Sequence, residues 1–242
     1  ELFGGYPTYV GHVLAPRWRR LPAAARRLAR WAIERWPAST GKVTLEFLLK
    51  QFVAGADQGE GNGKEGPRWL ERHLTWLGAG ALDAGIVADL ASRLDGFPGD
   101  DSLNRILWFD FVTYLPDDLL TKVDRATMLA SVEARAPYLD RAVVDLVLPL
   151  PSALKVRGLA TKAILKEAAR GLVPDAVIRR RKRGLSVPVA RWLNTGLAPL
   201  ADRLLATPLL AEHRSGRANH ARTLWPHLML ALWAERWGVN LA

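Results

Sequence analysis

The sequence predicts a mainly helical protein. Apolar residues recur at the helical period over most of the chain, strand-like runs are few, and prolines and glycines separate the helical segments. With 242 residues, of which 49% are hydrophobic, the chain can bury a core as one large domain or two small ones. We therefore expect an ordered, globular chain.

The first predicted helix is amphipathic and basic, running from Pro16 to Trp36 with a bend near Pro22. A second helical run, from Val43 to Val53, leads into a glycine-rich segment at about residues 55–66. Repeated glycines disfavour a sustained helix or strand, because glycine loses the most conformational freedom on folding. We expect this segment to be a mobile surface loop.

The middle of the chain contains the most apolar predicted helix. Helical spacing resumes at residues 67–77 and 82–94, and Phe97 to Asp101 then interrupts the pattern. The helix predicted at residues 103–114 is rich in apolar and aromatic side chains. A helix that is apolar on all sides is buried, so we expect it at the centre of the core.

A helix is predicted from Pro116 to about Ser131. Asp117 and Asp118 suit its first turn, where exposed amides and the positive end of the helix dipole lie. Asp140 can cap the next helix, at residues 141–148. Further helices are expected at residues 161–169, from residue 190, and at residues 224–237, with a basic run at residues 179–183 between the first two of these.

Composition limits the possible chemistry. The chain has no cysteine and five scattered histidines, which excludes thiolate catalysis and predicts no metal site. The formal net charge of +10 fits a polyphosphate, nucleic acid or an acidic chain as partner. No apolar stretch suits a membrane span and no signal peptide is recognisable, so we expect no membrane partner and a cytoplasmic location.

Five ordered blocks of sequence resemble the carboxy-terminal part of the synthetase domain of glutamine-hydrolysing asparagine synthetases. Beta-lactam synthetases and lasso-peptide cyclases share this domain, so the resemblance does not fix the product. The blocks cover nearly the whole chain, which makes their combination far more specific than any one of them. They lie at residues 1–6 (Glu-Leu-Phe-Gly-Gly-Tyr), 114–128, 131–140, 154–165 and 174–193.

The resemblance implies a fold and an activity. Residues 1–242 would form the helical carboxy-terminal portion of an α/β ATP-pyrophosphatase-type synthetase domain, of the adenine nucleotide alpha hydrolase-like class. Such enzymes use ATP and Mg²⁺ to convert a small-molecule or peptide carboxylate into an acyl-adenylate, release pyrophosphate, and let ammonia or another amine attack the acyl carbon. Negative charge accumulates on the leaving pyrophosphate, so fixed cations are required there.

Two lysines match catalytic positions of that family. Lys182 takes the place of the key catalytic lysine, and Lys162 matches a second lysine that contacts pyrophosphate. An ammonium group is a compact point charge suited to phosphate. The alternative for Lys182 is a solvated basic loop or a nucleic-acid patch. For Lys162 it is an exposed lysine at a helix start.

Further residues are candidates for substrate or nucleotide contacts. Asp118, Arg125 and Glu133 are candidates for substrate binding, although Asp118 also suits a simple helix-start acid. Asp124 with Arg125, and Glu133 with Arg135, also fit buried ion pairs that brace the site. Gly4 and Gly5 allow close approach of the backbone to the nucleotide, or form an ordinary turn.

The family's Ser-Gly-Gly-x-Asp-Ser pyrophosphate loop does not occur in these 242 residues. We expect an amino-terminal half carrying that loop, and the Mg²⁺ ligands, to be supplied as a separate chain or a removed segment. A rival hypothesis is a non-catalytic, basic helical module that binds nucleic acid. We favour the enzyme, because the sequence lacks an interleaved aromatic and basic stripe.

Overall fold

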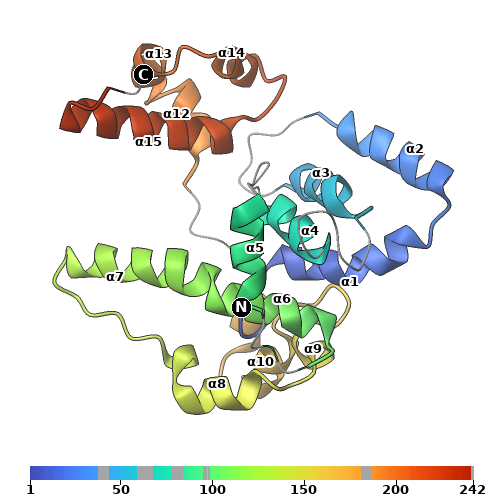
Figure 1. Cartoon of the computed structure of the whole chain (residues 1–242). Helices are drawn as coiled ribbons and strands as arrows, with labels where there is room; N and C mark the ends of the chain where they lie inside the picture. Colours follow the sequence, from blue (N-terminus) through green and yellow to red (C-terminus); the bar gives the residue numbers. More distant parts are fainter. Residues whose placement is uncertain are drawn as a thin grey trace. The chain divides into compact units, whose positions relative to one another are not determined.

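The computed structural model describes residues 1–37, 44–58, 68–77, 84–94, 97, 99–180 and 187–240. Within these ranges the secondary structure is helical, apart from an isolated antiparallel bridge between Arg157 and Ala160, and contains no strand (Figure 1). The predicted mainly α class is confirmed. None of the helices in the described ranges has the length and apolar character needed to cross a membrane.

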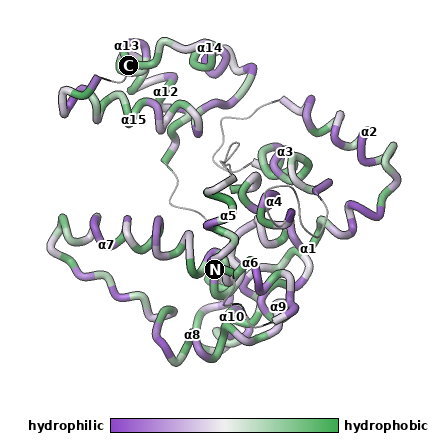
Figure 2. Tube along the Cα trace, in the orientation of Figure 1, coloured by the Kyte–Doolittle hydropathy of each residue, from purple (hydrophilic) through white to green (hydrophobic). Residues whose placement is uncertain are grey.

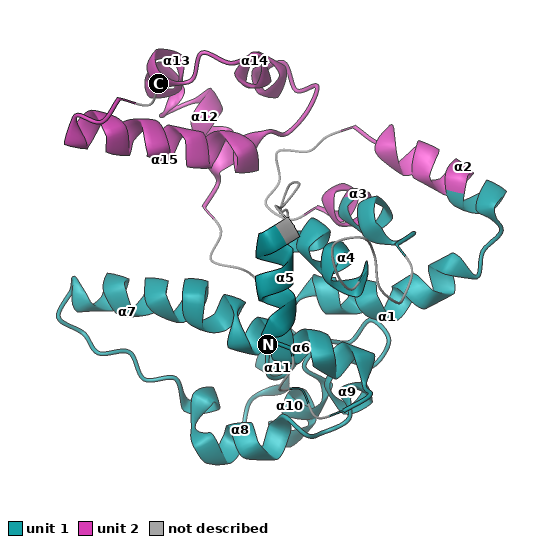
Figure 3. Ribbon diagram, in the orientation of Figure 1, with its two compact units in different colours: residues 1–26, 51–181 teal, residues 27–50, 182–242 magenta. Residues whose placement is uncertain are grey.

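The chain divides into two compact units (Figure 3). Unit 1 contains residues 1–26 and 51–181, and unit 2 contains residues 27–50 and 182–242. Each unit is therefore assembled from segments that are distant in sequence. The two units are described separately below.

The predicted basic helix at residues 16–36 is two helices. α1 spans Pro7–Arg19 and α2 spans Ala23–Glu34, with the break at the residues before and including Pro22. The expected bend near Pro22 is thus a complete interruption. α1 also begins earlier than predicted, with Pro7 at its first turn, where the missing amide proton of proline costs nothing.

The next three helices lie close to their predicted positions: α3 spans Leu45–Gly55, α4 spans Arg68–Leu77 and α5 spans Ala84–Ser92. The predicted glycine-rich loop begins where α3 ends, at Gly55. Its residues 59–66 lie outside the described ranges, so the expected mobility stays a prediction.

α6, which spans Ser102–Val112, forms the centre of the core of unit 1, as predicted. Its Ile106, Leu107 and Phe109 are almost completely buried. Asp101 caps this helix by accepting from the amides of Leu103 and Asn104. The core combines side chains of α1, α4, α5 and α6 with one from the segment after α9: Tyr9, Trp69, Leu70, Val87, Leu103, Ile106, Leu107, Phe109 and Val156.

The helical path continues past α6 through a π-helix, η1 (Leu115–Leu120), into α7 (Thr121–Met128). Pro116 was predicted to begin a new helix, but the amide of Asp117 already donates to the carbonyl of Thr113 at 3.0 Å. Asp117 and Asp118 therefore do not lie at a free helix start. A π-helical turn accommodates the proline, which has no amide proton for the regular ladder.

Short helices complete unit 1. They are the 3-10 turn η2 (Pro137–Leu139), α8 (Arg141–Val147), α9 (Ser152–Lys155), α10 (Ala163–Ala168) and α11 (Asp175–Arg179). The predicted cap of α8 is confirmed, since Asp140 Oδ1 accepts from the Ala142 amide at 2.9 Å.

Unit 2 has a core of its own. Its carboxy-terminal helices are α12 (Val189–Asn194), α13 (Ala198–Leu204), α14 (Pro208–Arg214) and α15 (Ala221–Trp237). Leu193 and Leu228 are fully buried in the cluster that these helices share. The predicted apolar terminal helix is confirmed and is three residues longer at its start. Both hydrophobic and hydrophilic residues occur along it (Figure 2).

Candidate functional site

Two segments that are far apart in sequence meet at Gly4 and Gly5. A Cβ atom added to Gly5 would lie 2.5 Å from Cε of Lys162 and 3.6 Å from its Cδ. The aliphatic stem of Lys162 therefore lies directly on the Gly5 backbone. Gly4 has a φ of +65°, and a Cβ there would lie 2.6 Å from Cγ2 of Val156. Both glycines therefore lie against side chains of the same unit, and the predicted approach of their backbone to the nucleotide stays a prediction.

Lys162 has an unusual backbone conformation. It is the N-cap of α10 with φ 54° and ψ 37°, in the left-handed region, whereas N-cap residues normally adopt extended angles. In the described part of the chain, φ is positive at one other non-glycine residue, Ser131. This conformation is unfavourable for lysine, because its Cβ atom lies too close to the following carbonyl oxygen.

Asp118 is connected to the same amino-terminal segment through two tyrosines. The Tyr114 and Tyr6 rings are 6.2 Å apart in an edge arrangement, and the Asp118 carboxylate is close enough to Tyr114 to affect its hydroxyl group. Burial and then the Asp118 carboxylate raise the pKa of Tyr114. Burial and then Glu1 raise the pKa of Tyr6. The Asp118 side chain is itself exposed. Its Oδ1 atom lies 3.6 Å from Nζ of Lys122, an ion pair of the kind expected between residues four apart on a helix.

Beneath these residues a buried chain of polar side chains crosses α1, α4 and α6. Asp110 Oδ2 accepts from the Tyr9 hydroxyl at 2.5 Å, and Asp110 Oδ1 lies 2.8 Å from His73 Nε2. His73 Nδ1 lies 3.1 Å from His12 Nε2, and the other nitrogen of His12 lies 3.4 Å from Arg72 Nε. With both imidazoles neutral, every contact in this chain pairs one donor with one acceptor.

Burial and neighbouring groups set the protonation of the side chains in this buried polar chain. Burial alone would raise the pKa of Asp110, but the contact with His73 and the hydrogen bond from the Tyr9 hydroxyl hold it below its ordinary value. Burial, and then the neighbouring His73 and Arg72, lower the pKa of His12 well below 6.5. The chain therefore carries its negative charge on Asp110 and keeps His12 neutral.

A second buried ionisable group lies behind the Gly4 turn. Lys155 is 1% exposed, and its ammonium group donates to Asn104 Oδ1 at 2.9 Å and to the Leu148 carbonyl at 3.1 Å. Burial lowers its pKa to about 8, against the opposing attraction of Asp101. Lys155 fixes the segment before Val156, which contacts Gly4.

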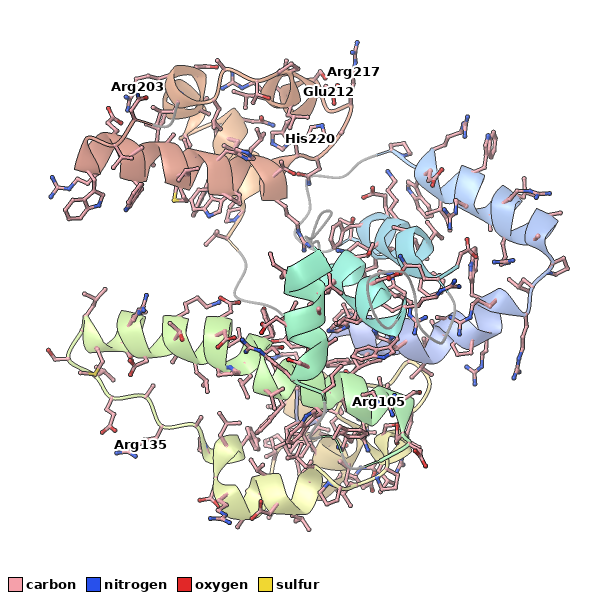
Figure 4. The ribbon with its side chains drawn as sticks, in the orientation of Figure 1. Arg105, Arg135, Arg203, Glu212, Arg217 and His220 are labelled. Atoms are coloured by element: carbon pink, nitrogen blue, oxygen red, sulfur yellow. The ribbon has the colours of Figure 1, made fainter. Side chains whose placement is uncertain are left out.

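Other predicted site residues are not gathered here. Arg125 is exposed on α7. Glu133 Oε1 lies 2.6 Å from Arg135 Nη2. Arg135 lies on the segment that joins α7 to α8 (Figure 4). The interpretation of Glu133 and Arg135 as a buried pair is wrong, because their side chains are 67% and 83% exposed. Asp124 is also exposed. Lys182 lies outside the described residues.

Sequence reasoning missed the buried polar chain. Asp110 stands inside a run of apolar and aromatic residues, which was the available signal for a buried, paired carboxylate. The sequence spacing of His12 and His73 shows that they are not a local metal-binding motif, but it carries no information about contacts between helices. No group of three or more metal-ligating side chains is present among the described residues.

A family profile matches almost the whole chain. The profile of the asparagine synthase family matches residues 1–235. The chain therefore belongs to the asparagine synthase family.

Curated relatives give the same family. Asparagine synthetase [glutamine-hydrolyzing] 1 of Bacillus subtilis is 26% identical over 251 residues, covering 96% of this chain and 38% of the relative. A putative asparagine synthetase [glutamine-hydrolyzing] of Mycobacterium bovis is 30% identical over 258 residues, covering 96% and 37%. The chain thus spans less than two fifths of the length of these relatives. No solved structure matches.

Proposed function

We propose that this chain is part of an ATP-dependent ligase that forms an amide bond through an acyl-adenylate. The observation that carries the proposal is the packing of Lys162 on Gly5, which joins two of the sequence blocks that resemble the synthetase domain. Family membership over residues 1–235 supports the same chemistry.

The site suits the charge that such a reaction develops. A carboxylate oxygen attacks the α-phosphorus of ATP, and the bond to the pyrophosphate breaks with its electron pair on the leaving group. The nitrogen of ammonia or another amine then attacks the acyl carbon, AMP leaves, and the nitrogen loses a proton. In the described part of the chain the ammonium group of Lys162 has no hydrogen-bond or ion-pair partner, so it is available to a phosphate oxygen.

Other parts of the machinery are assigned to a different segment. The described residues contain no cluster suited to hold Mg²⁺, so we assign no ligand of that ion to them. We propose that an amino-terminal half with the pyrophosphate loop completes the site. Exposed apolar side chains on α7 and just after it support these residues as the surface on which that half docks. Their side chains are 42–90% exposed: Val123, Met128, Leu129 and Val132.

The test is amide formation by the complete protein that contains this chain. Lys182→Ala should abolish the ATP-dependent release of pyrophosphate and AMP while the melting temperature is unchanged. Arg180→Ala, at an exposed position in the same basic run, should retain turnover and serves as the matched control. Near-normal turnover of Lys182→Ala would exclude the proposed role of that lysine.

The identity of the amine separates asparagine formation from peptide cyclisation of the lasso type. Ammonia with aspartate tests the first reaction. A precursor peptide with a free amino terminus and an acidic side chain tests the second. Pyrophosphate release that depends on one carboxylate and not on the other identifies the product class.

The rival, nucleic-acid binding, rests on the arginine-rich helix α2, of which no side chain is fully buried. Its affinity would fall steeply with salt, since bound counterions are released. Absence of binding to single-stranded or duplex nucleic acid at low salt removes this hypothesis.

A further inference from the structure

We infer that Gly5 is a positioning residue for Lys162, and that the left-handed backbone of Lys162 is strain retained for function. The inference rests on the proposed function, because it assigns the strained lysine to the polyphosphate. It adds a residue whose side chain is a single hydrogen atom and which acts only through its neighbour.

The first argument concerns space. At Gly5 the nearest three atoms to an added Cβ all belong to the Lys162 side chain, and the closest is Cε at 2.5 Å. Any side chain at residue 5 must therefore displace the end of Lys162. That end is flexible, so the displacement costs little folding stability, but it moves the ammonium group. The effect on the protein would be a misplaced charge and not a damaged core.

The second argument concerns the backbone. Lysine has no local hydrogen bond that favours the left-handed region, and glycine would occupy it without penalty. Strain of this kind persists where the surrounding structure imposes it, and it concentrates at functional sites. Here the strained φ of 54° starts α10 and turns the Lys162 stem onto Gly5. Replacement by glycine should relieve the strain and remove the charge together.

The two glycines of the turn have different roles. Gly4 has a positive φ and faces Val156 of the core, so its substitution damages folding. Gly5 does not have a positive φ, and the three atoms nearest to a Cβ added there all belong to Lys162. Gly196 supplies the matched control, since nothing lies within 4 Å of a Cβ added there.

The experiment compares Gly5→Ala, Lys162→Ala, their double mutant and Gly196→Ala in the complete protein. We expect Gly5→Ala to melt near the wild-type temperature and to lower kcat by about 10²-fold, as a displaced catalytic charge does. The double mutant should be no slower than Lys162→Ala. The nuclear magnetic resonance signal of the Lys162 ε-methylene group should shift in Gly5→Ala and stay in place in Gly196→Ala.

Lys162→Gly tests the strain. We expect its melting temperature to rise by about 2–4 °C while turnover is lost. The inference is overturned if Gly5→Ala keeps wild-type turnover while Lys162→Ala does not, or if the ε-methylene signal does not move. Full turnover of Lys162→Ala, with the signal shift present in Gly5→Ala, would instead reject the proposed role of Lys162 and leave the packing intact.

Discussion

Nε2 of His12 lies 3.1 Å from Nδ1 of His73 inside unit 1, and both imidazoles are buried. One ring must donate to the other. His73 also faces the Asp110 carboxylate and His12 faces the Arg72 guanidinium, which fixes the direction of donation from Arg72 toward Asp110. A proton added to His12 would lie on Nδ1, which accepts from the Arg72 guanidinium, and would set one donor against another. Folding therefore requires a neutral His12.

This requirement predicts a loss of stability in mild acid. The folded-state pKa of His12 is well below the ordinary 6.5, so below about pH 6.5 the unfolded chain binds a proton that the folded chain does not. The free energy of unfolding should then fall as the pH falls, by up to about 1.4 kcal/mol per pH unit from this group. Urea denaturation of the wild type between about pH 7.5 and pH 5 measures the slope.

His12→Gln should flatten that slope, whereas His227→Gln should leave it unchanged. His227 is exposed, and its Nδ1 lies 2.7 Å from the carbonyl oxygen of Thr223 on its own helix. Equal slopes for the wild type and His12→Gln would show that His12 does not control the acid sensitivity.

Asp110 should be coupled energetically to Tyr9. Asp110→Asn keeps the shape of the side chain but removes the charge that His73 and Tyr9 stabilise, and we expect a loss of about 1–3 kcal/mol in the free energy of unfolding. Tyr9→Phe removes the hydroxyl donor. In a double-mutant cycle the two changes should cost less together than separately, by about 0.5–3 kcal/mol. Additive costs would contradict the coupling, and Asp145→Asn, in an exposed pair with Arg141, is the neutral control.

Much of the helical framework was predictable, and the failures have physical causes. The spacing of apolar residues predicted α6 and α15 correctly, because a helix that packs in a core needs apolar residues at that spacing. The first half of α1 was missed because residues such as Gly11 and Val10 have weak helix propensity, and packing of Tyr9 and His12 in the core stabilises the helix instead. The position of the break at Pro22 was correct, because proline removes a backbone donor.

The candidate site was predictable only in part. Sequence blocks identified Gly4, Gly5 and Lys162, and their mutual contact needed coordinates because the blocks lie at opposite ends of unit 1 in sequence. Short helices such as α9 and α11 carry too few residues for a periodic signal. The contact of His12 with His73 depends on how α1 crosses α4, which no spacing within one helix encodes.

Lys155 should make stability rise with pH in mild alkali. Its folded-state pKa is about 8, below the ordinary 10.5, so between these values the unfolded chain holds a proton that the folded chain has lost. The free energy of unfolding of the wild type should therefore rise from about pH 8 to about pH 9.5 relative to Lys155→Met. Lys122→Met, at an exposed position, should follow the wild type. Parallel curves for the wild type and Lys155→Met would contradict a lowered pKa.

Two helix ends allow the free-energy cost of a left-handed backbone to be measured, at Ser131 by introducing glycine and at Gly238 by removing it. Ser131 has φ 54° after α7, and the amide of Val132 donates to the carbonyl of Thr127 across it, the pattern of a helix end that normally takes glycine. Ser131→Gly should raise the free energy of unfolding by about 1 kcal/mol.

Gly238, with φ 63°, ends α15, and a Cβ added there would meet no atom within 4 Å. Gly238→Ala should therefore lower the free energy of unfolding by about 1 kcal/mol for conformational reasons alone. Opposite signs for the two variants in urea denaturation would establish the penalty that the backbone of Lys162 carries as well. A Ser131→Gly variant that is no more stable than the wild type would mean that left-handed residues in this chain are not strained, and Lys162→Gly would then lose its expected gain.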